Sequence, residues 1–206
     1  NIPAGKRPRR FALTPDGTQL WVTNELGASV TVLDAKTNVV KETVTFAPKG
    51  FRSDDVTPVG IAMTRDGRTA YVTLGRANHV AVVDVASHKV RDYVLVGNRA
   101  WGATLNRDES MLVVVNGLSD DVSLVDTRTN KVLRSVPVGR VLELVAASPW
   151  GSKTIVVVTS DHGEAFGEHK MWRHGFELWE ELVRVPLILK IPGLPPQHIA
   201  TRRSAI

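Results

Sequence analysis

Residues that can hold a metal ion gather in one short stretch of the sequence. Asp161 and His162 follow the apolar run 155–158 after Thr159 and Ser160, and Glu164 and His169 come a few residues later. The end of a strand projects adjacent side chains into one opening, and carboxylate and imidazole donors suit Zn²⁺, Mn²⁺ or a similar divalent ion. The stretch therefore predicts a divalent metal site. The alternative interpretation is a surface loop with incidental histidines.

Composition limits the remaining chemistry. The 206 residues include no cysteine, which excludes disulfides, thiolate ligands and a cysteine nucleophile. The net charge of +5 comes in part from short basic runs with neither a helix nor an aromatic platform beside them, so we expect no nucleic-acid partner. No apolar run reaches the roughly 18 residues of a membrane span, and Asn1 opens no signal peptide. We expect a soluble chain with no membrane partner, and its localisation is left open.

A repeat that occurs three times precedes the candidate metal stretch. Asp16, Asp66 and Asp108 each open a turn, and each is followed 18 residues later by a second aspartate at a strand end. Successive turn aspartates are 50 and 42 residues apart, and β-branched runs between them predict four short strands per unit. Such units are typical of β-propeller blades. We expect the aspartates to cap turns.

The expected strands follow from these runs. The second strands are predicted at residues 21–24, 71–74 and 113–116, the third at 30–34, 80–84 and 122–126, and the fourth at 39–46, 90–96 and 132–138. Residues 2–5 are interpreted as the end of an earlier blade's last strand. Residues 142–148 and 154–160 begin a fourth unit without its outer strands, which gives about three and a half blades. His79 and His88 fall in this repeat, in turn or strand-edge positions, and are expected to be structural or solvent-facing.

The residues Trp21-Val22-Thr23-Asn24 and Tyr71-Val72-Thr73, each set after a turn of the Pro-Asp-Gly type, resemble the YVTN family of β-propellers. That family comprises bacterial and archaeal surface or periplasmic proteins. The resemblance covers about residues 1–148 and implies the fold, but propellers host binding, scaffolding and catalysis alike. An incomplete ring exposes apolar blade faces and strand edges, so we expect self-association, most simply as a homodimer.

The segment after the repeat has a different pattern. It reads as a buried strand containing Val157, a polar loop at 161–175, a short helix at 176–183 and a second strand at 185–191. Such a β-loop-α-β unit normally belongs to a parallel sheet. The sequence thus predicts a mainly β protein: propeller blades over residues 1–152 and a small β-loop-α-β appendage over 153–206.

The run Thr159-Ser160-Asp161-His162-Gly163-Glu164, together with Gly167-Glu168-His169 and Trp172-Arg173-His174-Gly175, resembles the C-terminal part of a sulfatase or phosphonate monoester hydrolase of the alkaline phosphatase superfamily. The resemblance implies that Asp161 and His162 bind the catalytic metal and that His174 contacts the anionic group of the substrate. His169 and Glu164 lie within reach in the same loop, and either is expected to supply a further ligand or a base.

The chain departs from the sulfatase pattern in two respects. It has no Cys/Ser-x-Pro-x-Arg motif, whose first residue becomes formylglycine, and none of the N-terminal aspartates that complete the metal shell. We therefore expect no formylglycine-dependent activity. Any hydrolysis is expected to use metal-bound water.

Basic residues of the repeat supply a possible site for an anion. If residues 154–160 dock as the second strand of a fourth blade, Asp161 and His162 emerge on the propeller face where the loops between blades open. Those loops carry the predicted substrate-binding residues Arg7, Arg52, Arg99 and Arg140, together with Lys6.

These patterns lead to two alternative functions. The first is a metal-dependent hydrolase of phosphate-type or sulfate-type esters on an oligomeric propeller scaffold, with a small anionic ester as substrate. The second is a non-catalytic propeller for binding or scaffolding, with a passive tail derived from a sulfatase.

Overall fold

The structure is a computed structural model that describes residues 2–137, 155–159 and 187–195. The chain divides into two compact units, Asn1–Val141 and Leu142–Ile206. The domain boundary expected after residue 152 stays a prediction. Within the described residues no helix is long and apolar enough to cross a membrane.

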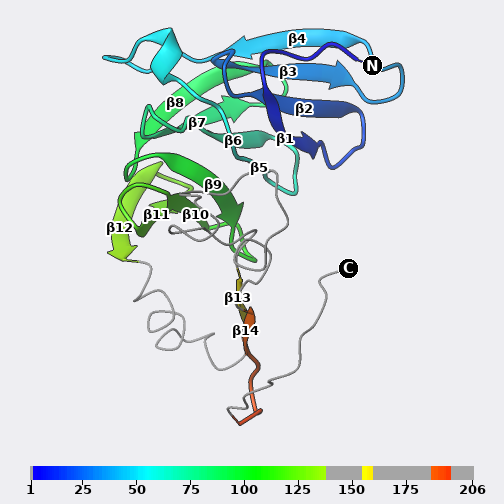
Figure 1. The fold of residues 1–206 in the computed structure, drawn as a ribbon. Coiled ribbons are helices and arrows are strands. Elements are labelled where there is room, and N and C mark those ends of the chain that lie inside the picture. Colours follow the sequence, from blue (N-terminus) through cyan, green and yellow to red (C-terminus); the bar gives the residue numbers. More distant parts are fainter. Residues whose placement is uncertain (1, 138–154, 160–186, 196–206) are drawn as a thin grey trace, which may run out of the picture. The chain divides into compact units, whose positions relative to one another are not determined.

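Three four-stranded antiparallel sheets make up the first unit, and each has its strands in sequence order (Figure 1). We call them blades 1, 2 and 3. Blade 1 comprises β1 (Pro8–Leu13), β2 (Gln19–Asn24), β3 (Ser29–Asp34) and β4 (Val40–Thr45); blade 2 comprises β5 (Ile61–Met63), β6 (Thr69–Thr73), β7 (His79–Asp84) and β8 (Lys89–Leu95); blade 3 comprises β9 (Ala100–Leu105), β10 (Met111–Asn116), β11 (Asp121–Asp126) and β12 (Lys131–Pro137). A short 3₁₀ helix, η1 (Ser53–Asp55), joins blades 1 and 2. The mainly β, propeller-type fold expected from the sequence is confirmed.

The second, third and fourth strands of every blade lie within two residues of their predicted ends. The prediction for residues 2–5 is wrong, because this segment forms no strand. The chain instead enters blade 1 through Lys6 and Arg7, whose carbonyl oxygens accept hydrogen bonds from the N–H groups of Leu26 and Glu25.

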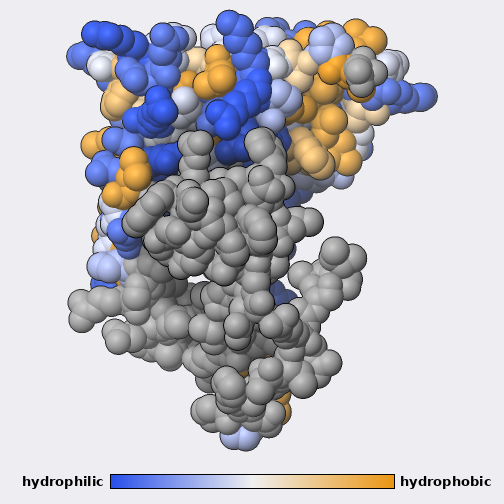
Figure 2. Space-filling view, in the orientation of Figure 1, coloured by the Kyte–Doolittle hydropathy of each residue, from blue (hydrophilic) through white to orange (hydrophobic). Residues whose placement is uncertain are grey.

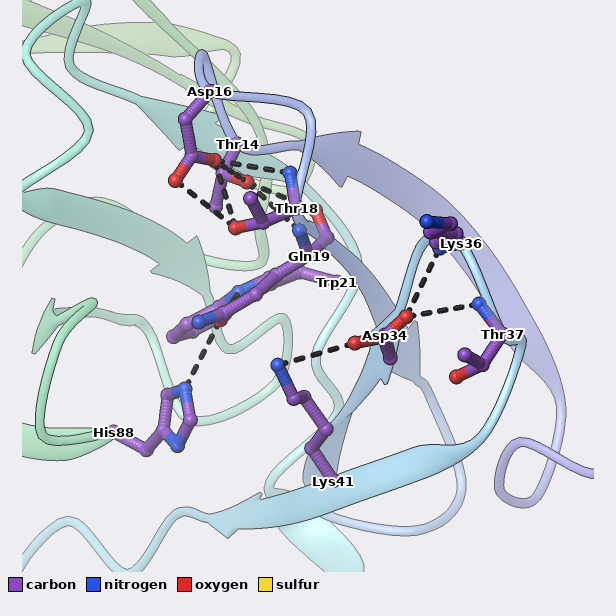
Figure 3. A network of polar contacts seen from close by, with 10 residues as sticks. All are labelled: Thr14, Asp16, Thr18, Gln19, Trp21, Asp34, Lys36, Thr37, Lys41 and His88. Carbon is purple, nitrogen blue, oxygen red and sulfur yellow. Dashed lines mark hydrogen bonds and ion pairs between the residues drawn. The ribbon is translucent and has the colours of Figure 1, made fainter.

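The repeated aspartates hold turns, as expected. Asp16 accepts hydrogen bonds from the Thr14 hydroxyl at 2.6 Å and from the Thr18 N–H at 3.0 Å (Figure 3). These bonds, the one from Thr14 first, lower the pKa of the Asp16 carboxyl below its usual value. Asp66 and Asp108 make the same kind of turn, with lowered pKa values of the same origin. Their role is structural.

The second set of aspartates caps the turn between the third and fourth strands. Asp34 accepts hydrogen bonds from the N–H groups of Lys36 and Thr37, and Lys41 Nζ lies 3.3 Å from its second oxygen (Figure 3). The bonds from Thr37 come first among the causes that lower the pKa of Asp34 to about 2. Asp84 and Asp126 cap the matching turns of blades 2 and 3.

The hydrophobic core lies between neighbouring blades, in two clusters. The first joins blades 1 and 2 and includes Trp21, Val30, Val32, Val44, Val72 and Val83. The second joins blades 2 and 3 and includes Tyr71, Val80, Val82, Leu112, Val114 and Val125. Blade 2 is covered on both faces, so its strands β6 and β7 are buried almost throughout.

A polar contact also crosses the interface between blades 1 and 2. Gln19 Oε1 accepts a hydrogen bond from Trp21 Nε1 at 3.0 Å and lies 3.0 Å from His88 Nε2, while the His88 ring packs edge-on against Trp21 (Figure 3). His79 contacts the Ala77 carbonyl through Nδ1. Both histidines therefore have the structural role expected for them.

In the second unit, β13 (Val156–Thr159) pairs with β14 (Leu187–Lys190) in an antiparallel two-stranded sheet. The expectation of a parallel arrangement is wrong. Val157 is 56% exposed and Ile155 is 61% exposed, so the expectation of a buried strand fails at these residues. An antiparallel sheet can have one face in solvent, so an apolar strand in it need not be buried. The helix predicted at 176–183 lies outside the described residues.

Candidate functional site

The loops at one end of the blades bring charged and aromatic side chains together. Arg7 precedes β1 and Arg9 lies in it, Glu25 follows β2, and Arg99 and Trp101 stand at the start of β9. The first strands of the three blades neighbour one another, so residues far apart in the sequence meet there. We call these five residues the Arg–Trp cluster.

Glu25 lies at the centre of the charged part of the cluster and is 8% exposed. Its Oε2 atom lies 3.2 Å from Arg7 Nε and 2.9 Å from Arg9 Nε. Neither contact has hydrogen-bond geometry, so this buried oxygen is paired by charge alone. Two guanidinium groups share one carboxylate, and one positive charge is left over.

Trp101 connects this ion pair to the third arginine. The Cζ atoms of Arg9 and Arg99 lie 5.0 and 4.9 Å from the centroid of its ring, which is the range of cation–π contacts. The Arg7 side chain is 56% exposed and that of Arg9 is 33% exposed. The cluster therefore carries three guanidinium groups against one carboxylate, and solvent reaches it.

An open groove of about 460 Å³ lies between the first strands of blades 2 and 3. Glu109 and Arg107 line it, but Glu109 accepts hydrogen bonds from Arg65 through N at 2.8 Å and through Nε at 3.1 Å. These contacts join blade 2 to blade 3. Because the Glu109 carboxylate is held by Arg65 in this way, the groove is a weaker candidate for a functional site than the Arg–Trp cluster.

Two of the predicted substrate-binding arginines, Arg7 and Arg99, lie in the Arg–Trp cluster, linked through Glu25, Arg9 and Trp101. Arg52 does not join them: it precedes η1, and its carbonyl oxygen accepts a hydrogen bond from the Asp55 N–H. The remaining predicted site residues lie outside the described residues: Arg140, Asp161, His162, Glu164, His169 and His174. Among the described residues, no group of three His, Asp or Glu side chains is placed to hold a metal ion.

Sequence reasoning missed Arg9, Glu25 and Trp101. Arg9, Val59 and Trp101 each stand seven residues before a turn aspartate, so they share one position of the repeat. Extending the repeat alignment upstream would have placed Arg9 and Trp101 at the same position of the first strands of blades 1 and 3. The pairing with Glu25 has no comparable signal, because it depends on the path of the chain before β1.

Comparison with known proteins identifies two families along the chain. The family model of the seven-bladed β-propeller lactonases matches residues 1–137, and that of the sulfatases matches residues 79–206. The two ranges overlap over residues 79–137. The two-part composition expected from the sequence is confirmed.

The curated relatives are sulfatases. A Δ4,5-hexuronate-2-O-sulfatase of Bacteroides thetaiotaomicron is 33% identical over 73 residues, which cover 33% of this chain and 15% of the relative. A sulfatase of Formosa agariphila is 41% identical over 58 residues, which cover 28% of this chain and 11% of the relative. The chain thus spans a small part of the length of the curated relatives that it matches.

Two similar solved structures each cover 63% of this chain. Hydrazine synthase of Kuenenia stuttgartiensis has a TM-score of 0.57 and 28% identity, covering 63% of this chain and 35% of that one. A periplasmic gluconolactonase of Pseudomonas aeruginosa has a TM-score of 0.53 and 25% identity, covering 63% and 38%. The chain belongs to the seven-bladed β-propeller lactonase family over residues 1–137 and to the sulfatase family over residues 79–206.

Proposed function

We propose that this protein is a metal-dependent hydrolase of sulfate-type or phosphate-type esters, carried on a β-propeller scaffold. The observation that carries the proposal is the sulfatase family match over residues 79–206, a range that includes Asp161, His162, His169 and His174. The relatives that match are named as sulfatases, which favours a sulfate ester over a phosphate ester.

The donor set after β13 fits a divalent cation in its chemistry. Asp161 supplies a carboxylate, and His162 and His169 supply imidazoles, which together suit Zn²⁺ or Mn²⁺. These three residues would hold the ion. A bound divalent ion would polarise the ester oxygens and lower the pKa of a water molecule.

The chain's other residues would bind the anion and move the proton. His174 would contact the anionic group of the ester, and Glu164 would accept the proton of the attacking water. Among the described residues, the Arg–Trp cluster offers the guanidinium groups of Arg7 and Arg99 to a sulfate or phosphate, whose oxygen pairs match the fork of an arginine.

A second candidate function is a non-catalytic propeller that binds or scaffolds another molecule. It is favoured by the absence of cysteine and of the Cys/Ser-x-Pro-x-Arg motif, which removes the nucleophile of formylglycine-dependent sulfatases. In this case the sulfatase-derived residues would be passive.

One experiment separates the two functions. The purified chain is analysed for bound metal and then assayed with aryl sulfate, aryl phosphate and lactone substrates, with and without a chelator. The hydrolase proposal expects turnover of a sulfate or phosphate ester that disappears on chelation and returns with Zn²⁺ or Mn²⁺. Turnover that survives exhaustive chelation contradicts it, and an inactive panel leaves the binding function in its place.

Two variants assign the metal. His162→Ala should lower metal occupancy and hydrolysis together. His198→Ala removes an imidazole outside the predicted donor set and serves as the matched control. Full activity in His162→Ala, or an equal loss of metal in His198→Ala, would show that the ion is held elsewhere.

A further inference from the structure

Blades 1 and 3 close the same corner of their sheets with hydrogen bonds, where the second strand turns into the third. In blade 1, Asn24 Nδ2 donates to Ser29 Oγ at 3.1 Å and to Thr31 Oγ1 at 2.9 Å. The residues at the same repeat positions make the matching bonds of blade 3: Asn116, Asp121 and Ser123.

Blade 2 replaces this polar corner with apolar and aromatic side chains. Leu74, His79 and Ala81 stand at the three positions, and Tyr93 stands where the other blades have a threonine and a serine. The rings of His79 and Tyr93 pack edge-on, with their centroids 6.4 Å apart. A repeat that is broken at four positions of one blade indicates a local role that the fold does not require.

A longer connection reaches the same corner. The turn aspartates of blades 1 and 2 are 50 residues apart and those of blades 2 and 3 are 42 apart, and the additional residues lie between β4 and β5. From this connection, the Phe51 ring packs edge-on against His79 with 5.5 Å between centroids, and the Ala47 N–H donates to the Tyr93 hydroxyl at 2.9 Å. The connection is therefore attached to the two aromatic residues that distinguish blade 2.

A pocket of about 370 Å³ lies at this place. Its lining combines Lys49 of the connection with residues of β7 and β8: His79, Val90, Arg91, Asp92 and Tyr93. Hydrophilic and hydrophobic residues lie side by side on the surface over blades 1 and 2 (Figure 2). The volume is that of a small-molecule site.

The charged groups leave one positive charge at the pocket. Arg91 is paired with Asp84, which balances its charge. The Asp92 carboxylate accepts a hydrogen bond from Asn130 Nδ2 of blade 3 at 3.3 Å, so it is turned towards that blade. Lys49 is exposed and forms no ion pair with any residue that the structure describes. The pocket therefore offers an ammonium group beside an aromatic wall.

We propose that this pocket binds a small aromatic carboxylate, such as benzoate. The Lys49 ammonium pairs with the carboxylate of the ligand. The oxygen of the Tyr93 hydroxyl accepts the N–H of Ala47, so its proton is left to donate to the same carboxylate. The ring of the ligand lies against Val90 and His79. This site does not depend on the proposed hydrolase activity.

Three probes separate the charge of the ligand from its ring. Benzoate carries both, acetate carries only the carboxylate, and benzyl alcohol carries only the ring. NMR titration of the full chain should give a dissociation constant for benzoate on the order of a few millimolar, and at least about tenfold weaker binding of the other two probes. No saturable shift with benzoate up to about 50 mM, or equal binding of acetate or benzyl alcohol, would overturn the site.

A charge-removing variant tests the lysine. Lys49→Gln should weaken benzoate binding at least about fivefold and leave benzyl alcohol binding unchanged, because it removes only the charge. Lys36→Gln removes an exposed lysine in the turn after β3 and is the matched control, which should bind benzoate as the wild type does. Equal weakening in the two variants would show that benzoate responds to net charge and not to this pocket.

A substitution taken from the repeat tests the aromatic wall. His79→Ser introduces the residue type that blade 1 has at this position and should weaken benzoate binding at least about threefold. Tyr93→Phe keeps the ring, removes the hydroxyl and should have an effect of about the same size. Circular dichroism verifies that each variant folds. Wild-type affinity in either folded variant would contradict the assigned pocket.

Discussion

The hydroxyl of Thr23 donates a hydrogen bond to the carbonyl oxygen of Val59 across the interface between blades 1 and 2. The same oxygen atom of Thr23 accepts a hydrogen bond from the Arg10 N–H at 3.0 Å. One buried side chain therefore joins the first strand of its own blade to the segment just before the first strand of the next, β5.

Replacing Thr23 tests how much its hydrogen bond to Val59 contributes to the free energy of unfolding. Thr23→Val keeps the shape but leaves the Val59 carbonyl and the Arg10 N–H unpaired, which should lower the free energy of unfolding by about 1–3 kcal/mol. Thr45→Val, at an exposed position of β4, is the control and should change it by less than about 0.5 kcal/mol. Urea denaturation measures both. Equal effects would mean that the bond across the blades contributes nothing.

The pH dependence of stability follows from the capping aspartates. The pKa of Asp34 is lowered to about 2, so its stabilising effect is complete above about pH 4 and is lost as the pH falls towards 2. In Asp34→Asn, the urea concentration at the midpoint of unfolding should therefore decrease less between about pH 4 and pH 2 than it does in the wild type. Lys36→Ala keeps the N–H that donates to Asp34 and serves as the control. If the urea midpoint of Asp34→Asn decreases with pH as steeply as that of the wild type, the Asp34 carboxylate is not the source of the pH dependence.

The charge balance of the Arg–Trp cluster leads to a prediction about its affinity for anions. Glu25→Gln removes the carboxylate shared by Arg7 and Arg9, so sulfate should bind several-fold more tightly, and Arg9→Gln should weaken sulfate binding. Arg128→Gln alters an arginine of another ion pair and is the control. Titration calorimetry at low ionic strength measures all three. If Glu25→Gln and wild type bind sulfate alike, the cluster is not an anion site.

The exposure of Val157 predicts that a charged substitution there has little effect on stability, whereas its apolar sequence context predicts a large effect. Val157→Asp should change the free energy of unfolding by less than about 0.5 kcal/mol, because the side chain is 56% exposed. Val32→Asp, at a fully buried position of β3, should cost about 3 kcal/mol or more. Thermal unfolding followed by circular dichroism distinguishes them. A large loss in Val157→Asp would place this strand in a core.

The strands that sequence predicted best are those with the strongest local signal. Residues 80–84 and 122–126 are β-branched runs bounded by an aspartate that caps the next turn, and both form strands. The first strands carry no such signal. Pro8–Leu13 contains two arginines after a proline, and Ala100–Leu105 contains a glycine, so their pairing is set by the neighbouring β2 and β10.

Only part of the candidate site could be predicted from the sequence. Arg7 and Arg99 were predicted from their loops, whereas the contact between Arg9 and Trp101 joins blades 1 and 3 and depends on how the inner strands lie together. Burial at Glu25 cannot be derived from local residue types, because Arg7 and Arg9 reach its carboxylate only after β1 has paired with β2. The exposed face of the ribbon at Val157 is likewise a property of packing.

The sequential strand order within each blade bears on how such a chain can arise. Every strand pairs with its neighbour along the chain, and the core clusters join adjacent blades, so the contacts within blades 1 and 2 do not require any particular sequence after β12. Proteins built from nearest-neighbour modules tolerate the gain, loss or exchange of a terminal module. Recombination of genes at a blade boundary therefore leaves the upstream modules able to fold, and a segment of different ancestry can be inherited there.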